Sequence, residues 1–178
     1  MDQKTVCAVT RAGGYIPSVI KRIFILCLAI AVVTFDQASA ASVTGNNGAT
    51  LFASKVTGIK SGEKITVTGS HFDETVGIYL AICKVVKKSE VPSPCGGGID
   101  KTGASGASIW ISSNPPPYGV GLAKEFQPGG RFSYSIRVSP MIGKLDCRKI
   151  KCAIYVRADH TRTDDRSFDL SLPITFIK

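Results

Sequence analysis

Histidine is scarce in this chain, and no segment shows the 3.6-residue apolar period of an amphipathic helix. The two histidines, His71 and His160, lie in polar stretches, and no serine stands in the strand-turn-helix context of a hydrolase nucleophile. The carboxylates cluster in turns rather than on facing strands, where a general acid and a general base could be held apart. These absences predict a protein that is not an enzyme.

Long apolar runs are also few. The one from Ile23 to Val33 is too short to span a bilayer comfortably. Lys21 and Arg22 precede it, and Ala38-Ser39-Ala40 offers the small residues that a signal peptidase requires. We therefore expect a Sec-type signal peptide over residues 1–40. No later stretch could span a membrane, so the product should be secreted, either free outside the cell or held at the envelope by contacts.

The remainder of the chain should form one domain. Residues 41–50 are small, polar and Gly-rich, and we expect a flexible leader there. Residues 51–178 are enough for a single domain with its own core, and we expect a monomer. The chain is basic, with 22 Lys and Arg against 13 Asp and Glu, and it remains basic once the signal peptide is removed.

Cysteine usage points to an oxidising compartment. Of the six cysteines, Cys7 and Cys27 would leave with the signal peptide, and an even number in an exported chain indicates disulfides. Their spacings fit short zinc knuckles poorly. Four cysteines allow three pairings, one of which would link the third and sixth predicted strands across the core. The four that remain are Cys83, Cys95, Cys147 and Cys152.

Short alternating stretches follow one another along the domain, separated by Gly, Pro, Ser and Asp. They predict an all-β, seven-stranded antiparallel sandwich of immunoglobulin-like type. Pro173 should lie on an edge strand or at a bulge, because it cannot donate a hydrogen bond. The predicted strands cover residues 51–57, 63–68, 76–86, 108–111, 132–138, 152–157 and 168–176.

Three of these stretches carry a family resemblance. G-E-K-I-T-V-T-G-S at 62–70, G-I-Y-L-A-I-C at 77–83 and L-D-C at 145–147 resemble the neocarzinostatin family of actinobacterial secreted apoproteins. The resemblance implies sequential pairing, Cys83 with Cys95 and Cys147 with Cys152. It also implies a cleft beside the first disulfide that holds a small hydrophobic or aromatic molecule without covalent bonds.

The same resemblance assigns residues to the cleft. Cys83 and Cys95 would form its floor and Val85 part of its wall. We add further lining candidates from their positions in the predicted strands and in the segment 96–130. These candidates are Ile82, Trp110, Tyr118, Phe126 and Tyr155.

Two departures from the family pattern matter. Residues 139–146 are too few for the aromatic ribbon that closes one side of the family's cleft, whereas 96–130 is a long insertion. The insertion could fold over the cleft as a lid, with Trp110 either in the core or at the cleft mouth. Alternatively, it could make the protein an adhesive module that binds an extracellular or envelope protein, with no small ligand.

Antiparallel pairing of the third and sixth strands would gather charged residues at both ends of the sandwich. A solvated basic rim is the favoured interpretation of one end, over an anion site, and nucleic acid is not expected because interleaved aromatics are missing. At the other end His71 and His160 are the candidate metal ligands, but turn formation by Asp159 and Asp165 accounts for the carboxylates. We therefore expect no metal and no cofactor. The basic residues are Lys84, Lys87, Lys88, Lys144, Arg148, Lys149 and Lys151.

Overall fold

The computed structural model describes residues 39–96 and 108–177. All of the described residues lie in one compact unit, 36–178. The predicted signal peptide therefore lies almost entirely outside the described residues and stays a prediction. Among the described residues, no helix is long and apolar enough to cross a membrane.

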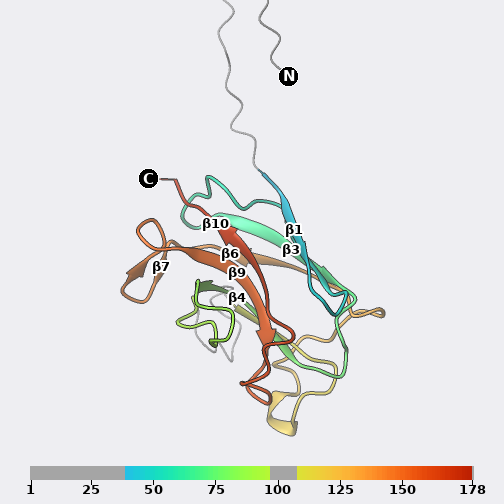
Figure 1. Ribbon diagram of the computed structural model, residues 1–178. Coiled ribbons are helices and arrows are strands. Elements are labelled where there is room, and N and C mark those ends of the chain that lie inside the picture. Colours follow the sequence, from blue (N-terminus) through green and yellow to red (C-terminus); the bar gives the residue numbers. More distant parts are fainter. Residues whose placement is uncertain (1–38, 97–107, 178) are drawn as a thin grey trace, which may run out of the picture. The chain divides into compact units, whose positions relative to one another are not determined.

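Two antiparallel sheets of four strands each stack face to face as a sandwich (Figure 1). The first sheet has the order β1-β2-β3-β6 and the second has the order β10-β9-β4-β5. The prediction of an all-β antiparallel sandwich is confirmed. The first sheet contains β1 (Ala41–Thr44), β2 (Thr50–Ala53), β3 (Lys64–Ser70) and β6 (Phe132–Arg137). The second contains β4 (Ile78–Lys84), β5 (Ser108–Ile111), β9 (Cys152–Ala158) and β10 (Leu170–Ile174).

The flexible leader predicted over residues 41–50 is wrong. Ala41 to Thr44 forms β1, which pairs antiparallel with β2 from Ala41 opposite Ala53 to Thr44 opposite Thr50. Asn47 and Gly48 make the tight turn between them, with Gly48 at φ 81° and the Asn47 side chain accepting a 3.2 Å hydrogen bond from the Ala49 amide. Asn-Gly is a strong hairpin signal. The described residues thus place eight strands in the sandwich rather than seven.

Each of the seven predicted stretches forms a strand, with ends shifted by a few residues. Pro173 lies on β10, an edge strand, where a residue without an amide hydrogen is tolerated. It is exposed. The third and sixth predicted strands, now β4 and β9, are antiparallel neighbours from Ile78 opposite Ala158 to Lys84 opposite Cys152. Both expected disulfides are present, Cys83–Cys95 and Cys147–Cys152.

Residues 139–146, predicted to be too few for the family's aromatic ribbon, form a shorter ribbon without aromatic residues. Strands β7 (Met141–Ile142) and β8 (Leu145–Asp146) pair across a turn at Gly143. Ile142 is buried and Met141 is exposed, so this ribbon contributes one side chain to the core and presents another to solvent. Besides it, the described residues include a single short 3₁₀ helix, η1 (Pro117–Gly119).

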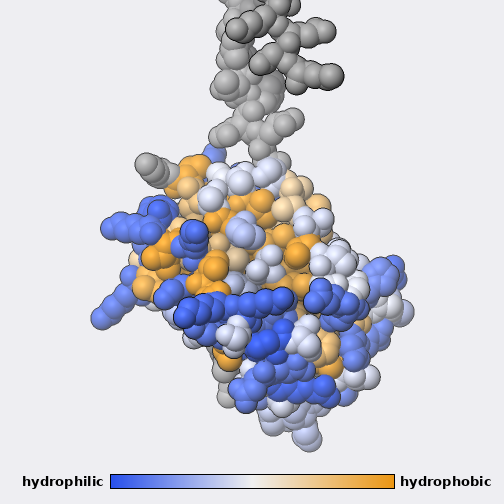
Figure 2. Space-filling model, viewed as in Figure 1, coloured by the Kyte–Doolittle hydropathy of each residue, from blue (hydrophilic) through white to orange (hydrophobic). Residues whose placement is uncertain are grey.

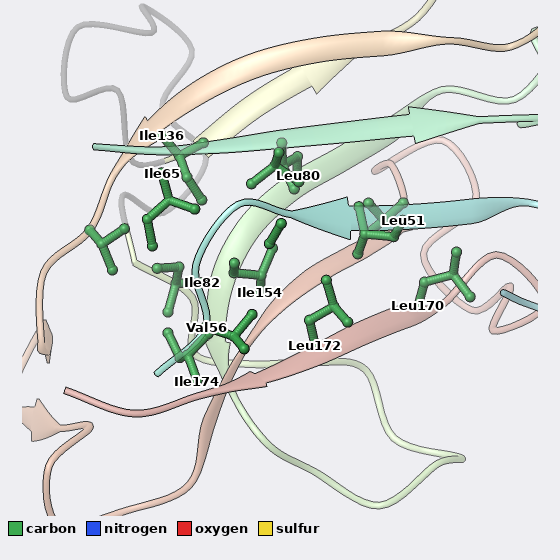
Figure 3. Packing of buried hydrophobic residues seen from close by; sticks show 14 of the residues in the cluster. Leu51, Val56, Ile65, Leu80, Ile82, Ile136, Ile154, Leu170, Leu172 and Ile174 are labelled. Carbon is green, nitrogen blue, oxygen red and sulfur yellow. The ribbon is translucent and has the colours of Figure 1, made fainter. Parts of the chain in front are cut away.

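The core lies between the two sheets and follows the two-residue side-chain period of the strands. Ile65 on β3 and Ile136 on β6 face Leu80 and Ile82 on β4 and Ile154 on β9, and Figure 3 shows these side chains converging. All are at most 4% exposed. Burying each such side chain stabilises the fold by roughly 1.5–3 kcal/mol. The alternate residues of β4 and β9 must then point to the outer face of the second sheet, which carries the candidate site.

Candidate functional site

On β4, the residues that lie an even number of positions from Cys83 face outward, and their partners on β5 and β9 share that outer face. On β4 these are Tyr79, Ala81 and Cys83, and the strand register sets Arg157 of β9 and Trp110 of β5 on either side of Tyr79. Ala81 lies in the same way beside Tyr155 of β9. The face therefore has an aromatic and cationic row toward the β9–β10 loop, and smaller side chains toward the disulfide.

The loop after β4 returns over this face because the Cys83–Cys95 disulfide ties its two ends together. Backbone hydrogen bonds hold the same ends, since the Lys84 amide donates to Pro94 O at 3.1 Å and the Gly96 amide donates to Ile82 O. Tyr155 lies beneath the loop, 7% exposed, packed with Ala81, Cys83 and Ala153 and against Val85 and Cys95. Its side chain fills the middle of the face.

One hollow lies on the Tyr79 side of the loop and has a volume of about 310 Å³. Its floor is the sheet, and its wall is the loop with the consecutive segment Val91 to Cys95. Arg157 is the one charged residue among its lining side chains. The lining residues are Tyr79, Ala81, Val91, Pro92, Ser93, Pro94, Cys95, Ser108 and Arg157. We call this the first hollow.

A second hollow, also of about 310 Å³, lies on the β10 side of the same loop. Tyr155 and Val85 line it, with charges of both signs around them. Burial raises the pKa of the Asp169 carboxyl to about 6, against the opposing influence of Arg166, whose Nη1 lies 2.8 Å from Asp169 Oδ2. Its lining residues are Val43, Val85, Val86, Lys87, Lys88, Glu90, Pro92, Tyr155, Asp169, Leu170 and Ser171.

Figure 2 shows apolar residues scattered over the upper part of the visible face, with strongly hydrophilic residues at its left edge and over its lower half. This is the side on which β9 and β10 lie in front in Figure 1.

At the far end of the aromatic row, four rings form a cluster that we call the aromatic corner: Tyr79, Trp110, Tyr118 and His160. His160 Nδ1 pairs with the Tyr79 hydroxyl, and Nε2 lies 2.6 Å from the Tyr118 hydroxyl. The Trp110 ring lies 6.1 Å from that of Tyr79 and 5.0 Å from that of His160, between centroids. These contacts hold Tyr79 rigidly at the edge of the first hollow.

Asp159 anchors this cluster from behind. Asp159 is only 2% exposed, and its carboxylate is satisfied within the protein. It accepts a 2.9 Å hydrogen bond from Trp110 Nε1 and two more from the amide and hydroxyl of Thr161. Burial, reinforced by the negative charge of Asp159, raises the pKa of Tyr79 to about 12, so its hydroxyl stays neutral. The predicted turn-forming roles of Asp159 and Asp165 are confirmed, since Asp165 Oδ1 accepts from the Ser167 amide at 2.9 Å.

The cleft candidates are only partly brought together. Val85 and Tyr155 lie beside the second hollow, and Cys95 lines the first, while Cys83 packs beneath with Tyr155. Trp110 is not in the inter-sheet core but on the outer face, in the aromatic corner with Tyr118. Whether any of them contacts a ligand stays a prediction.

Ile82 and Phe126 were wrongly assigned to the cleft. Ile82 has the opposite parity to Cys83, so it points into the core, 4% exposed (Figure 3). Phe126 is 7% exposed and packs in the core with Phe72 and Phe132, each at a centroid distance of 6.4 Å. The part of the insertion that carries Phe126 therefore contributes to packing rather than to a lid.

The basic residues do gather at one end of the second sheet. Lys84 pairs in register with Cys152, and the Val85 amide donates to Lys151 O at 2.9 Å, which joins the two basic segments. Arg148 is engaged by Asp146, with Nε 2.9 Å from Oδ1. Lys87 and Lys88 line the second hollow. The side chains of Lys84, Lys87, Lys88, Lys144, Arg148, Lys149 and Lys151 are exposed, as a solvated rim requires.

The two histidines have separate surroundings. His71 is exposed and lies in a turn at φ 61°, whereas His160 uses both ring nitrogens on tyrosine hydroxyls. In the described part of the chain, no three His, Cys, Asp or Glu side chains converge in a way that could hold a metal ion.

Sequence reasoning missed Tyr79, Ala81, Pro92, Pro94, Ser108 and Arg157. A signal for Tyr79 and Ala81 was present in the sequence, because residues of one strand that lie an even number of positions from Cys83 share its face. Placing Arg157 beside Tyr79 requires the β4–β9 register as well, and placing the prolines requires the path of the loop.

The structure is therefore an immunoglobulin-like β-sandwich stapled by two short-loop disulfides, one of which ties a loop over its outer face. The chain belongs to the neocarzinostatin family, whose model matches residues 51–172. The apoproteins of this family are non-enzymatic carriers that bind chromophore ligands. Among solved structures the fold is similar to macromomycin, at 13% identity and a TM-score of 0.44, over 78% of this chain and 100% of that one. A comparison with curated proteins finds no significant match.

Proposed function

We propose that this protein is a secreted carrier that holds a small aromatic molecule, without covalent bonds, on the outer face of the second sheet beside Cys83–Cys95. The observation that supports the proposal is the first hollow, a concavity of about 310 Å³ walled by Val91, Pro92 and Pro94. Ligand sites are concave and mostly apolar, with a few placed polar groups, and this volume lies at the lower end of their range.

The structure also bears on the size of such a ligand. Tyr155 fills the middle of the face under the loop, so the two hollows are separated rather than joined into one long cleft. A molecule with one to two fused rings suits either hollow better than an extended polycycle does. The pairing of the four cysteines in the described part of the chain and the disulfide-bonded family fold are consistent with the proposed secretion.

Native mass spectrometry of the protein recovered from its own culture supernatant tests the proposal. We expect a retained molecule of low mass that is released on denaturation. Val91→Trp, which places an indole at the first hollow, should reduce the retained fraction. Val120→Trp is the matched control, because Val120 is a loop valine, 72% exposed, that lines neither hollow. Protein that never retains a ligand, and binds no small aromatic probe, would contradict the proposal.

One observation favours the adhesive alternative. The segment from Tyr118 to Leu122 exposes three apolar side chains, with Tyr118 60%, Val120 72% and Leu122 42% exposed. Exposed apolar patches often mark sites of protein interaction. If this segment binds an envelope protein, Val120→Asp combined with Leu122→Asp should release the protein from cells into the medium. Ligand retention in the first hollow should then be unaffected.

A further inference from the structure

The first hollow is lined by a positive charge, Arg157, that makes no direct ion pair. Arg157 is half-buried, and among residues 39–96 and 108–177 it takes part in none of the three ion pairs. The two carboxylates near it do not contact it directly, since Asp169 pairs with Arg166 and Asp159 accepts from Trp110 and Thr161, although both favour its charged form. The other residues that line the hollow are neutral.

Burying a cation without an anion is costly. Desolvation lowers the pKa of Arg157, and repulsion from Arg166 lowers it further, while attraction to Tyr79, Asp169 and Asp159 offsets part of this effect. A guanidinium nevertheless stays charged at neutral pH. An anion that entered the hollow would therefore meet a guanidinium that has no direct ion-pair partner, in a partly desolvated place where pairing is stronger than on an open surface.

The surroundings of Arg157 also fix the orientation of its guanidinium group. Its guanidinium carbon lies 5.4 Å from the centroid of the Tyr79 ring, and this ring is held by His160 and Trp110. Contact with an aromatic face orients the guanidinium plane and leaves its N–H edges free for a planar acceptor such as a carboxylate. Opposite, the apolar wall of Val91, Pro92 and Pro94 offers a surface for a ring.

We propose that the ligand of the first hollow is a small aromatic acid, whose carboxylate pairs with Arg157 while its ring packs between Tyr79 and the proline wall. This inference rests on the proposed function, since it names the chemical class of the molecule carried. Arg157 is a binding residue in it, and Tyr79 a positioning residue for the guanidinium.

The test compares two isosteric probes, 2-naphthoate and the uncharged 2-naphthamide, by calorimetric titration at neutral pH. The protein is that produced from the full chain. We expect 2-naphthoate to bind at least about tenfold more tightly than the amide, which corresponds to about 1.4 kcal/mol. Arg157→Gln should abolish this preference, and Arg157→Lys should keep part of it, because a lysine retains the charge without the planar fork. Arg137→Gln is the control, since Arg137 is exposed on β6 of the opposite sheet.

If wild-type protein binds both probes equally, or Arg157→Gln still prefers the acid, the anionic class is wrong, while binding of the amide leaves the carrier proposal standing. If neither probe binds, both proposals fall. The wild-type comparison needs no variant, so poor folding of Arg157→Gln would not prevent a decision.

Discussion

The Tyr118 hydroxyl lies 2.6 Å from His160 Nε2, across 42 residues of sequence, although the Tyr118 side chain is 60% exposed. A neutral imidazole has one N–H, so one of the two tyrosine hydroxyls on His160 donates and the other accepts. The bond therefore ties η1 and the segment after it to the β9–β10 loop.

Removing this bond should cost little stability. We expect Tyr118→Phe to lower the free energy of unfolding by about 0.5–1.5 kcal/mol, the usual net value of one hydrogen bond. Because Trp110 is the single tryptophan of the chain and stacks on the Tyr118 ring, Tyr118→Ala should shift its fluorescence while Tyr118→Phe should not. Urea unfolding followed by that fluorescence measures both effects. A loss as large as that of a core truncation would contradict the exposed placement.

Phe126 should behave in the opposite way, although it belongs to the same insertion. Phe126→Ala removes a ring that is 7% exposed and packed on Phe72 and Phe132, so the free energy of unfolding should fall by about 3–5 kcal/mol. Phe126→Leu should cost clearly less, because it leaves a smaller cavity. Thermal unfolding by circular dichroism distinguishes them, and a Phe126→Ala protein with an unchanged midpoint would show that the ring is not part of the core.

Gly77 should not tolerate a side chain. A Cβ added there would collide with Asp159 Oδ2, the atom that accepts from Trp110 Nε1. We expect Gly77→Ala to destabilise the protein and to shift the emission of Trp110, because the buried carboxylate must move. Gly96→Ala is the control, since its nearest neighbour would be Ile82 O at an ordinary 3.5 Å. Equal effects of the two substitutions would argue against this packing.

The contribution of Asp169 to stability should fall as the pH rises from about 4 to about 6. Burial raises the pKa of Asp169 in the folded protein from 3.8 to about 6, so between these values the folded state binds more protons than the unfolded state. The stabilisation is therefore present at about pH 4 and is lost as Asp169 ionises. Calorimetric melting temperatures across this range should decrease less steeply for Asp169→Asn than for wild type. An NMR titration that finds the Asp169 carboxyl near its ordinary pKa would refute the premise.

Much of the fold could be predicted from alternation alone. Phe132, Ile136 and Val138 lie an even number of positions apart, so their side chains face the same side of the chain. A strand with one buried face requires this spacing, and the pattern therefore predicts β6. Two errors have local causes. Residues 41–44 carry little apolar pattern, and their strand exists because β2 offers an edge to pair with. Ile82 was placed in the cleft because it neighbours Cys83, although adjacent strand residues face opposite ways.

The candidate site could be predicted only in outline. Its location beside Cys83 and Cys95 followed from the family resemblance, and the paired cysteines lie as that resemblance implied. The division of the face into two hollows did not follow, because it depends on Tyr155 lying beneath a loop whose path the disulfide determines. The position of Trp110 did not follow from the sequence either, because both the core and the cleft mouth were open to it.

The sequence by itself determined seven of the strands in the sandwich and their buried faces, because alternation is a local property of the chain. The pairing of the cysteines was implied by the family resemblance. The tertiary structure decided which side chains share the outer face. Arg157 meets Tyr79 through the β4–β9 register, and it makes no direct ion pair with Asp169 because that carboxylate pairs with Arg166. Such relations depend on distances between residues far apart in sequence, and no local pattern encodes them.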